Sequence, residues 1–269
     1  QAALASHRLV GWMFWDPYGI ERYTELGVPD GFGWYITSRG APLLAAGHQA
    51  VTAAFATISP AFIEVCVTHA LAHTTPEAIY DVRNEAVGVG LRRYVPEICD
   101  ALAEMGPDLW AVADELRSFG RVLFAAHRAM PRPDDPVVSA WCAVNTIREW
   151  RGDTHFAVLV AEDIDATTAG ILDDARRNYG GWIPRSRGSD DTAIDDAMER
   201  LAARGYADDG EVNGAGLDYR RRLEERTDAL TAEPWRRLGA SRTRELVDLI
   251  APVGARLVER IVTTALAKQ

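Results

Sequence analysis

Signals that start helices recur along this chain, and they constrain its fold more than any other feature. Ser59 before Pro60 and Thr75 before Pro76 each place a capping hydroxyl ahead of a proline that suits the first helical turn. Apolar residues then follow at steps of three and four, the spacing of an amphipathic helix. The sequence therefore predicts a mainly α-helical protein.

Three prolines and two aspartates in "PRPDDP", residues 131–136, mark the best internal boundary. We expect a helical, aromatic-rich domain over residues 1–130 and a second domain over residues 137–269. A chain of 269 residues is long enough for one large or two ordinary domains, and its core needs no disulfide or metal to hold it.

The order of elements after residue 150 predicts a winged helix-turn-helix. Helical patterns cover residues 153–164, 167–180 and 188–205, and a further one covers 217–230. Between the last two, Asp-Gly and Asn-Gly turn signals flank a possible hairpin with Tyr206 and Val212 on its two short strands. Three helices, a small hairpin and a helix are the order of that fold.

Two further patterns bear on the architecture. Residues 241–266 predict a long amphipathic helix interrupted near Pro252, which packs on the domain or on a partner subunit, so that a homodimer through this helix is an open expectation. The segments "WYITSRG" (34–40) and "WIPRSRG" (182–188) share four residues at matching places, which indicates either a degenerate internal duplication or a chance match.

The composition excludes several classes of protein. The formal net charge is −10, and an acidic chain is repelled by phosphate backbones and anionic membranes unless it has a basic patch. Cys66, Cys99 and Cys142 are far apart in apolar surroundings, which is typical of reduced thiols in the cytoplasm. No apolar run is long enough for a membrane span, and the N-terminal residues lack the pattern of a signal peptide. We therefore expect a cytoplasmic protein without a membrane partner.

The segment 188–205 occupies the place of a DNA-reading helix, but its charge does not suit that role. Asp191, Asp195 and Glu199 recur every four residues and so share one face. Residues 189–204 carry five acids and two arginines, which would add repulsion against phosphate. DNA binding is therefore the less favoured expectation.

The segment "REWRGDTH" contains the strongest candidates for catalytic residues. We expect Asp153 to cap a helix that starts there, with His155 in its first turn, kept neutral by the helix N-terminus. A neutral imidazole can act as a general base, oriented by Asp153, while Arg151 binds an anionic group. The alternative is a structural clamp between Arg151 and Asp153, with His155 a satisfied core residue.

Eight of the chain's 23 aromatic residues lie between positions 12 and 35. Such density can line a pocket for a flat or apolar ligand, with Trp15 and Trp34 as walls and Tyr35, Ser38 and Arg39 as polar anchors. An ordinary aromatic core is the competing interpretation.

Cys66, His69 and His73 share a helix face, and two histidines four residues apart can grip one metal ion. No fourth ligand is evident nearby, so a buried cysteine beside two semi-exposed histidines is the simpler interpretation. The sequence assigns no metal and no cofactor to the protein, and motifs for nucleotide binding are absent.

These segments resemble one known family. The pieces "YITSRGAPL", "ISPAF", "LFAAHRAMPRPDDPVVSAW", "IREWRGDTHFAVLVAEDID" and "LEERTDAL" are similar to the SalK-like helix-turn-helix family of largely uncharacterised bacterial proteins. The resemblance covers nearly the whole chain and implies an N-terminal helical region joined to a C-terminal winged helix. It departs at "SDDTAIDD", where a Trp-rich segment is usual, and it implies no common reaction.

We expect a small-molecule-binding protein whose pocket lies between the aromatic half and a winged-helix half that has lost DNA binding. Its ligand would be apolar or aromatic with an anionic group, contacted by Trp15, Trp34, Tyr35, Ser38 and Arg39 and by Arg151, Asp153 and His155. One alternative is an enzyme of small-molecule metabolism that uses the last three residues catalytically. The other is a DNA-binding transcriptional regulator.

Overall fold

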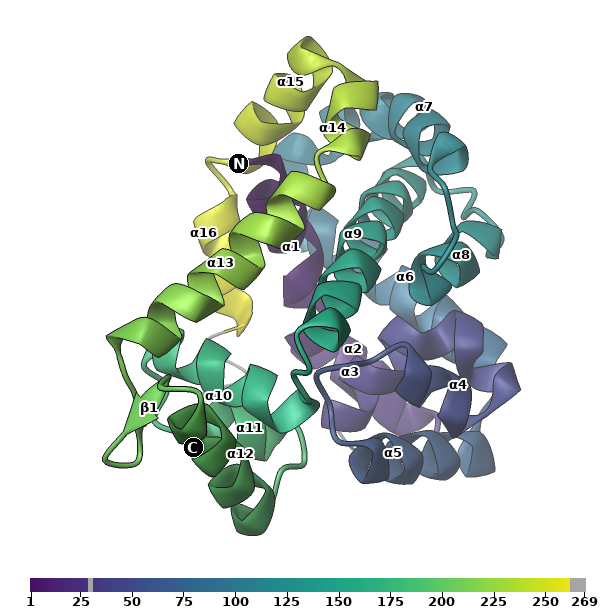
Figure 1. Ribbon diagram of the computed structural model, residues 1–269. Coiled ribbons are helices and arrows are strands. Elements are labelled where there is room, and N and C mark those ends of the chain that lie inside the picture. Colours follow the sequence, from purple (N-terminus) through teal and green to yellow (C-terminus); the bar gives the residue numbers. More distant parts are fainter. Residues whose placement is uncertain (29–30, 262–269) are drawn as a thin grey trace. The chain divides into compact units, whose positions relative to one another are not determined.

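The computed structural model describes residues 1–28 and 31–261, apart from the side chains of residues 31 and 32 (Figure 1). Helices make up most of this part of the chain, and its strands form one two-stranded antiparallel hairpin. The predicted fold class, mainly α-helical with a small hairpin, is confirmed. None of the described helices is both long and apolar enough to cross a bilayer.

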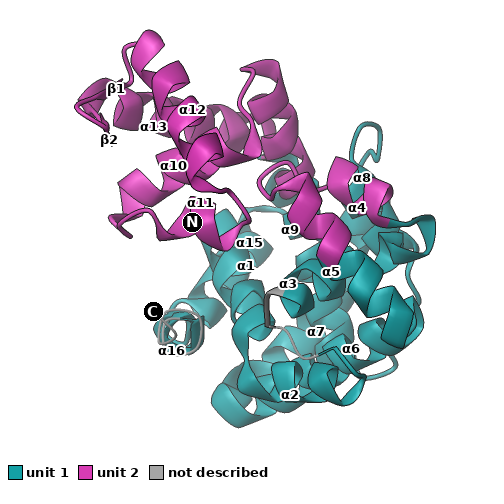
Figure 2. Cartoon of the chain, turned by 90° about the horizontal axis from the view of Figure 1, so that it is seen from below, with its two compact units in different colours: residues 1–47, 66–150, 232–269 teal, residues 48–65, 151–231 magenta. Residues whose placement is uncertain are grey.

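Contacts divide the chain into two compact units, coloured separately in Figure 2. Unit 1 comprises residues 1–47, 66–150 and 232–269, and unit 2 comprises residues 48–65 and 151–231. The units therefore interleave along the sequence, whereas the sequence placed a single boundary at residues 131–136. Whether residues 1–130 and 137–269 fold independently stays a prediction.

Unit 1 is built from helices of the first half of the chain and from the three helices that end its described part. Its elements are α1 (Ala2–Gly11), η1 (Trp12–Trp15), α2 (Pro17–Glu25), α3 (Gly31–Gly40), η2 (Ala41–Ala46), α6 (Pro76–Tyr94), η3 (Pro96–Ile98), α7 (Cys99–Glu115), α8 (Val122–Ala129), α14 (Glu233–Leu238), α15 (Ala240–Ile250) and α16 (Gly254–Ile261). Two helices contribute residues to both units: α5 (Pro60–His73) and α9 (Pro136–Ala161).

From residue 166 onward, unit 2 has the element order that the sequence predicts, with one addition. Its elements are α4 (His48–Ala53), α10 (Ala166–Arg177), α11 (Trp182–Ser186), α12 (Asp191–Ala203), β1 (Ala207–Asp208), β2 (Glu211–Val212) and α13 (Gly214–Leu230). In the hairpin, Ala207 faces Val212 and Asp208 faces Glu211. The short helix α11 between α10 and α12 was not expected.

The core of unit 2 explains why α12 lies where it does. Ala197 and Leu201 are buried, and Ile194 and Met198 pack partly buried against the same cluster, as the helical spacing predicts. Tyr206 stacks on Tyr219 of α13, with ring centroids 4.4 Å apart. One face of α12 is thus used for packing, and its acidic face stays exposed.

The predicted helix start at Asp153 is wrong. Asp153 lies inside α9, which runs without a break from Pro136 to Ala161. The prediction rested on Asp153 as a natural capping residue, but such a residue is also tolerated inside a helix that packing holds together. Asp153 therefore caps no helix, and His155 is not in a first turn.

The C-terminal segment is interrupted near Pro252, as the sequence predicts, and it forms two helices. Residues 251–253 form a turn between α15 and α16, and both helices pack against α1 within unit 1. The remainder of the predicted segment, residues 262–266, lies outside the described residues. The two segments that suggested a duplication also continue differently, since η2 follows the first and α12 follows the second.

Candidate functional site

The eight predicted site residues fall into the two units: residues 15, 34, 35, 38 and 39 belong to unit 1, and residues 151, 153 and 155 belong to unit 2. Each group is described by itself.

In unit 2, Arg151 is held by acids of α13 and not by Asp153. Its Nη2 donates to Glu224 and also to Asp228, 2.8 Å away. Glu224 in turn accepts from Arg220, whose other nitrogen lies 3.2 Å from Asp173 of α10. Although burial opposes it, hydrogen bonds from Arg151 and the charge of Arg220 lower the pKa of Glu224 to about 2. This chain of ion pairs ties α9, α10 and α13 together.

His155 lies beside these ion pairs and is neutral; its hydrogen bond goes to Thr227 of α13. The hydroxyl of Thr227 donates to the carbonyl of Leu223, so it accepts from His155 Nδ1–H at 2.9 Å. This bond fixes the tautomer and leaves Nε2 as the basic nitrogen. Burial lowers the pKa of His155 to about 4, against the opposing effect of Glu224. The imidazole is thus neutral as expected, but the cause is burial and not a helix N-terminus.

In unit 1, the predicted site residues Trp34 and Ser38 lie in the core. Both are fully buried in α3. Trp34 Nε1 donates to the carbonyl of Met13, and the Ser38 hydroxyl donates to the carbonyl of Trp34, one turn earlier. The aromatic-core interpretation holds for these two side chains.

Trp15, Tyr35 and Arg39 do lie together. The rings of Trp15 and Tyr35 stack with centroids 5.8 Å apart, and Phe14 meets Tyr35 edge to face at 5.2 Å. Arg39 Nη1 donates to the Tyr35 hydroxyl at 3.2 Å. Trp15 and Tyr35 are half-buried, so this group of rings is partly accessible.

Arg39 points from this group to a carboxylate that the sequence did not single out. Its Nε and Nη2 donate to the two oxygens of Glu149 at 3.0 and 2.7 Å, a bidentate pair in which both side chains are buried. Although burial opposes it, the charges of Arg39 and Arg148 lower the pKa of Glu149 to about 2. No sequence pattern marked Glu149, because it stands among charged neighbours, directly after Arg148 and two residues before Arg151.

Arg148 is the second cation on that carboxylate. Its Nη1 donates to Glu149 Oε1 at 2.6 Å, and its guanidinium lies 5.9 Å from the ring of Phe14. Its side chain is 15% exposed. Among the described residues this is its one hydrogen bond, and its other nitrogens are not among the buried atoms that lack a partner, so the rest of the guanidinium reaches solvent.

A third buried guanidinium lies next to these two. Arg83, on α6, is 1% exposed and donates to Asn84 Oδ1 at 3.1 Å and to His127 Nδ1 at 3.4 Å. His127 Nε2–H therefore donates to the carbonyl of Arg39, 2.9 Å away. Burial, and then the charge of Arg83, lowers the pKa of His127 to about 3, so this imidazole is neutral.

The polar cluster of unit 1, defined as residues 39, 83, 127, 148 and 149, thus carries more positive than negative charge. The cluster holds three guanidiniums and one carboxylate, and Arg39 and Arg148 both pair with that carboxylate. Burial, together with the nearby charge of Arg39, lowers the pKa of Arg148 although Glu149 opposes this. A dry environment with excess positive charge favours an anion, because an uncompensated buried charge is costly.

Asn145 lies one helical turn before Arg148 and Glu149 on α9. Its side chain is 2% exposed, and its Oδ1 has no hydrogen-bond partner among the described residues. Buried acceptors of this kind are uncommon in proteins, and each requires a physical explanation.

The two histidines of the alternative metal site lie next to each other on α5. His69 and His73 are exposed with ring centroids 4.6 Å apart, and His73 Nδ1 is bonded to the carbonyl of His69 at 2.8 Å. Within residues 1–28 and 31–261, no group of three or more His, Cys, Asp or Glu side chains is arranged to hold a metal ion.

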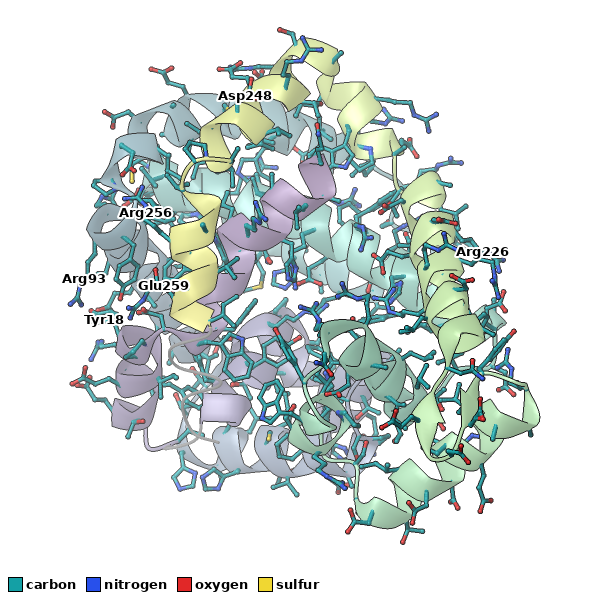
Figure 3. All side chains as sticks on the ribbon, turned by 90° about the vertical axis from the view of Figure 1, so that its left-hand side faces the viewer. Tyr18, Arg93, Arg226, Asp248, Arg256 and Glu259 are labelled. Carbon is teal, nitrogen blue, oxygen red and sulfur yellow. The ribbon has the colours of Figure 1, made fainter. Side chains whose placement is uncertain are left out.

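The surface of unit 2 is acidic, and its arginines are largely engaged. Residues 151–231 contain eleven arginines, no lysine and eighteen acids, a formal charge of −7. On α12 and just before it, Arg200 pairs with Asp165 and Arg185 pairs with Asp191. Arg226, labelled on α13 in Figure 3, lies 2.6 Å from Glu162. Contacts with phosphate would have to replace these pairs.

Comparison with known proteins places the chain in a broad group. The family model that matches is described as a helix-turn-helix family, and the match covers residues 1–264. No curated protein and no solved structure gives a significant match.

Proposed function

The chain belongs to a helix-turn-helix family, and from this premise we propose that it is a member that binds a small anionic molecule. The ligand is held by Arg148, next to the buried pair of Arg39 and Glu149. The single observation that carries this proposal is that Arg148, although mostly buried, donates to one carboxylate oxygen only, and Arg39 already shares that carboxylate.

The hydrogen bonds leave a suitable edge on Arg148. Glu149 accepts three N–H groups and is well satisfied, so it cannot balance a second guanidinium fully. A guanidinium with an unoccupied edge binds carboxylate or phosphate through two parallel hydrogen bonds. A bound anion would also offset the charge excess in the polar cluster of unit 1.

The neighbouring rings suit the apolar part of such a ligand. Phe14 lies beside Arg148, and Tyr35 and Trp15 continue the group of rings. Small-molecule sites combine apolar walls with a few polar anchors in this way. The earlier expectation that Arg151, Asp153 and His155 complete the same pocket stays a prediction, as does an enzyme that uses His155.

Thermal unfolding in the presence of a panel of small carboxylates and phosphates, at constant ionic strength, tests the proposal. Wild type should be stabilised by some members of the panel, and Arg148→Gln should lose that response. Arg93→Gln is the matched control because Arg93 is exposed on α6 of the same unit (Figure 3). The proposal fails if Arg148→Gln responds like wild type, or if no anion stabilises the wild type.

DNA binding is a second candidate, favoured by the family and by the order of α10, α11, α12, the hairpin and α13. The acidic face of α12 opposes it, because that face would meet phosphates. We expect no binding tighter than micromolar in a gel shift at physiological salt. Sub-micromolar binding with a steep salt dependence would replace our first proposal by a regulator.

The narrower kinship with SalK-like proteins is supported by the segments around residues 35–43 and 147–165, and it stays a prediction. A homodimer through the C-terminal helices stays a prediction as well, and sedimentation of the full chain tests it.

A further inference from the structure

The buried side chain of Asn145 has no role in the proposal above as it stands. It is an amide 2% exposed, with an acceptor oxygen that no described residue satisfies. A buried acceptor without a donor destabilises a fold, so a group that completes it would be bound favourably. A water molecule or a ligand can supply the donor.

The place of Asn145 on α9 relates it to the anion site. Arg148 follows at three residues and Glu149 at four, so the three side chains are neighbours on one helix face. Arg148 offers donors to an anionic group, and Asn145 Oδ1 accepts from a donor. The two requirements are complementary, and their side chains start about 5–6 Å apart.

We infer that the ligand is an aromatic carboxylate that carries an O–H or N–H donor on its ring. Its carboxylate binds Arg148, its donor bonds to Asn145 Oδ1, and its ring joins the group formed by Phe14, Tyr35 and Trp15. This inference rests on the proposed function, since it assumes the anion site at Arg148.

Calorimetric titration of the full chain with benzoate and with 2-, 3- and 4-hydroxybenzoate tests the inference. At least one hydroxylated isomer should bind wild type roughly fivefold more tightly than benzoate does, the gain from one neutral hydrogen bond. In Asn145→Leu this preference should disappear, while the affinity for benzoate should stay within about twofold because the carboxylate contact is untouched.

Arg148 separates the two proposals. Arg148→Gln should lower the affinity for all four probes by roughly tenfold or more, because a hydrogen bond to a charged group is lost. Arg148→Lys keeps the charge and serves if the Gln variant does not fold, and Arg93→Gln should bind like wild type. If binding depends on Arg148 but hydroxylation brings no gain, or if Asn145→Leu keeps the gain, this inference is wrong and the anion site stands. If none of the four benzoates binds, this inference is wrong, and the thermal panel of carboxylates and phosphates decides separately on the anion site. If Arg148→Gln binds them unchanged, both proposals are wrong.

Discussion

Arg39 and Glu149 form a bidentate ion pair inside unit 1, although 110 positions separate them in the chain. Arg39 Nη2 lies 2.7 Å from Glu149 Oε2, and both side chains are withdrawn from water. This pair joins the end of α3 to the middle of α9, and it orients the second cation, Arg148, toward the neighbouring rings.

Removal of the carboxylate at this pair should destabilise the protein strongly. We expect Glu149→Gln to lower the free energy of unfolding by about 3–5 kcal/mol, because two guanidiniums lose their common partner in a dry environment. Urea unfolding measures this loss. Glu85→Gln is the control, since Glu85 bonds at the surface to Arg22 and to Tyr18, the latter labelled in Figure 3, and its replacement should cost about 1 kcal/mol or less. Equal losses of unfolding free energy in the two variants would contradict the role of Glu149 as the common partner of two buried guanidiniums.

The two neutral histidines should make stability depend on pH. The pKa of His127 is lowered to about 3 and that of His155 to about 4, so the unfolded chain binds more protons than the folded one below about pH 6.5. Stability is therefore complete above this value and is lost as the pH falls toward 4. Each histidine should contribute a slope of about 1 kcal/mol per pH unit between pH 6 and 5.

Chemical unfolding at several pH values measures that slope. In His155→Gln the slope should decrease, because one of the two titrating groups is gone. A slope unchanged in this variant would mean that His155 titrates in the folded protein much as it does in the unfolded chain.

Opposite effects are expected when each of two asparagines is replaced by leucine. Asn145→Leu removes a buried acceptor that has no protein partner, so the free energy of unfolding should stay equal or rise by about 1 kcal/mol. Asn84→Leu removes the acceptor of the buried Arg83 and should cost about 1–3 kcal/mol. Thermal or urea unfolding of the ligand-free protein compares them. A clear loss in Asn145→Leu would show that its amide is satisfied in solution.

The packing of α6 on η1 gives a steric prediction. A Cβ at Gly90 would come 2.2 Å from the ring of Trp12, which is buried and cannot move aside. Gly90→Ala should therefore destabilise the protein by about 1–3 kcal/mol. Gly214→Ala, at the open start of α13, meets no atom within 4 Å and should be neutral or slightly stabilising. Similar results for the two alanines, measured by urea unfolding, would contradict this packing.

Local signals predicted the helices well where a cap starts them. Thr75 accepts from the amide of Ala78 ahead of Pro76, as predicted, whereas Asn213, taken from the sequence only as a turn signal, also caps a helix, because it accepts from the amide of Gly216. The same reasoning failed at Asp153, because a residue suited to a cap can also be tolerated inside a helix that packing holds together.

The candidate site could be predicted only in part. Trp15, Tyr35 and Arg39 are close in sequence, so their cooperation was visible as local density. The roles of Glu149 and Arg148 could not be predicted, because the contact between Glu149 and Arg39 is created by tertiary packing of α3 and α9 within unit 1. Burial of Trp34 and Ser38 also depends on that packing and has no signal in a single sequence.

Native mass spectrometry of the purified full chain tests the central claim most directly. We predict that wild type and Arg93→Gln retain a small non-covalently bound anion after purification, and that purified Arg148→Gln lacks it. The same bound mass on Arg148→Gln, or its absence from the wild type, would contradict the assignment of an anion site at Arg148.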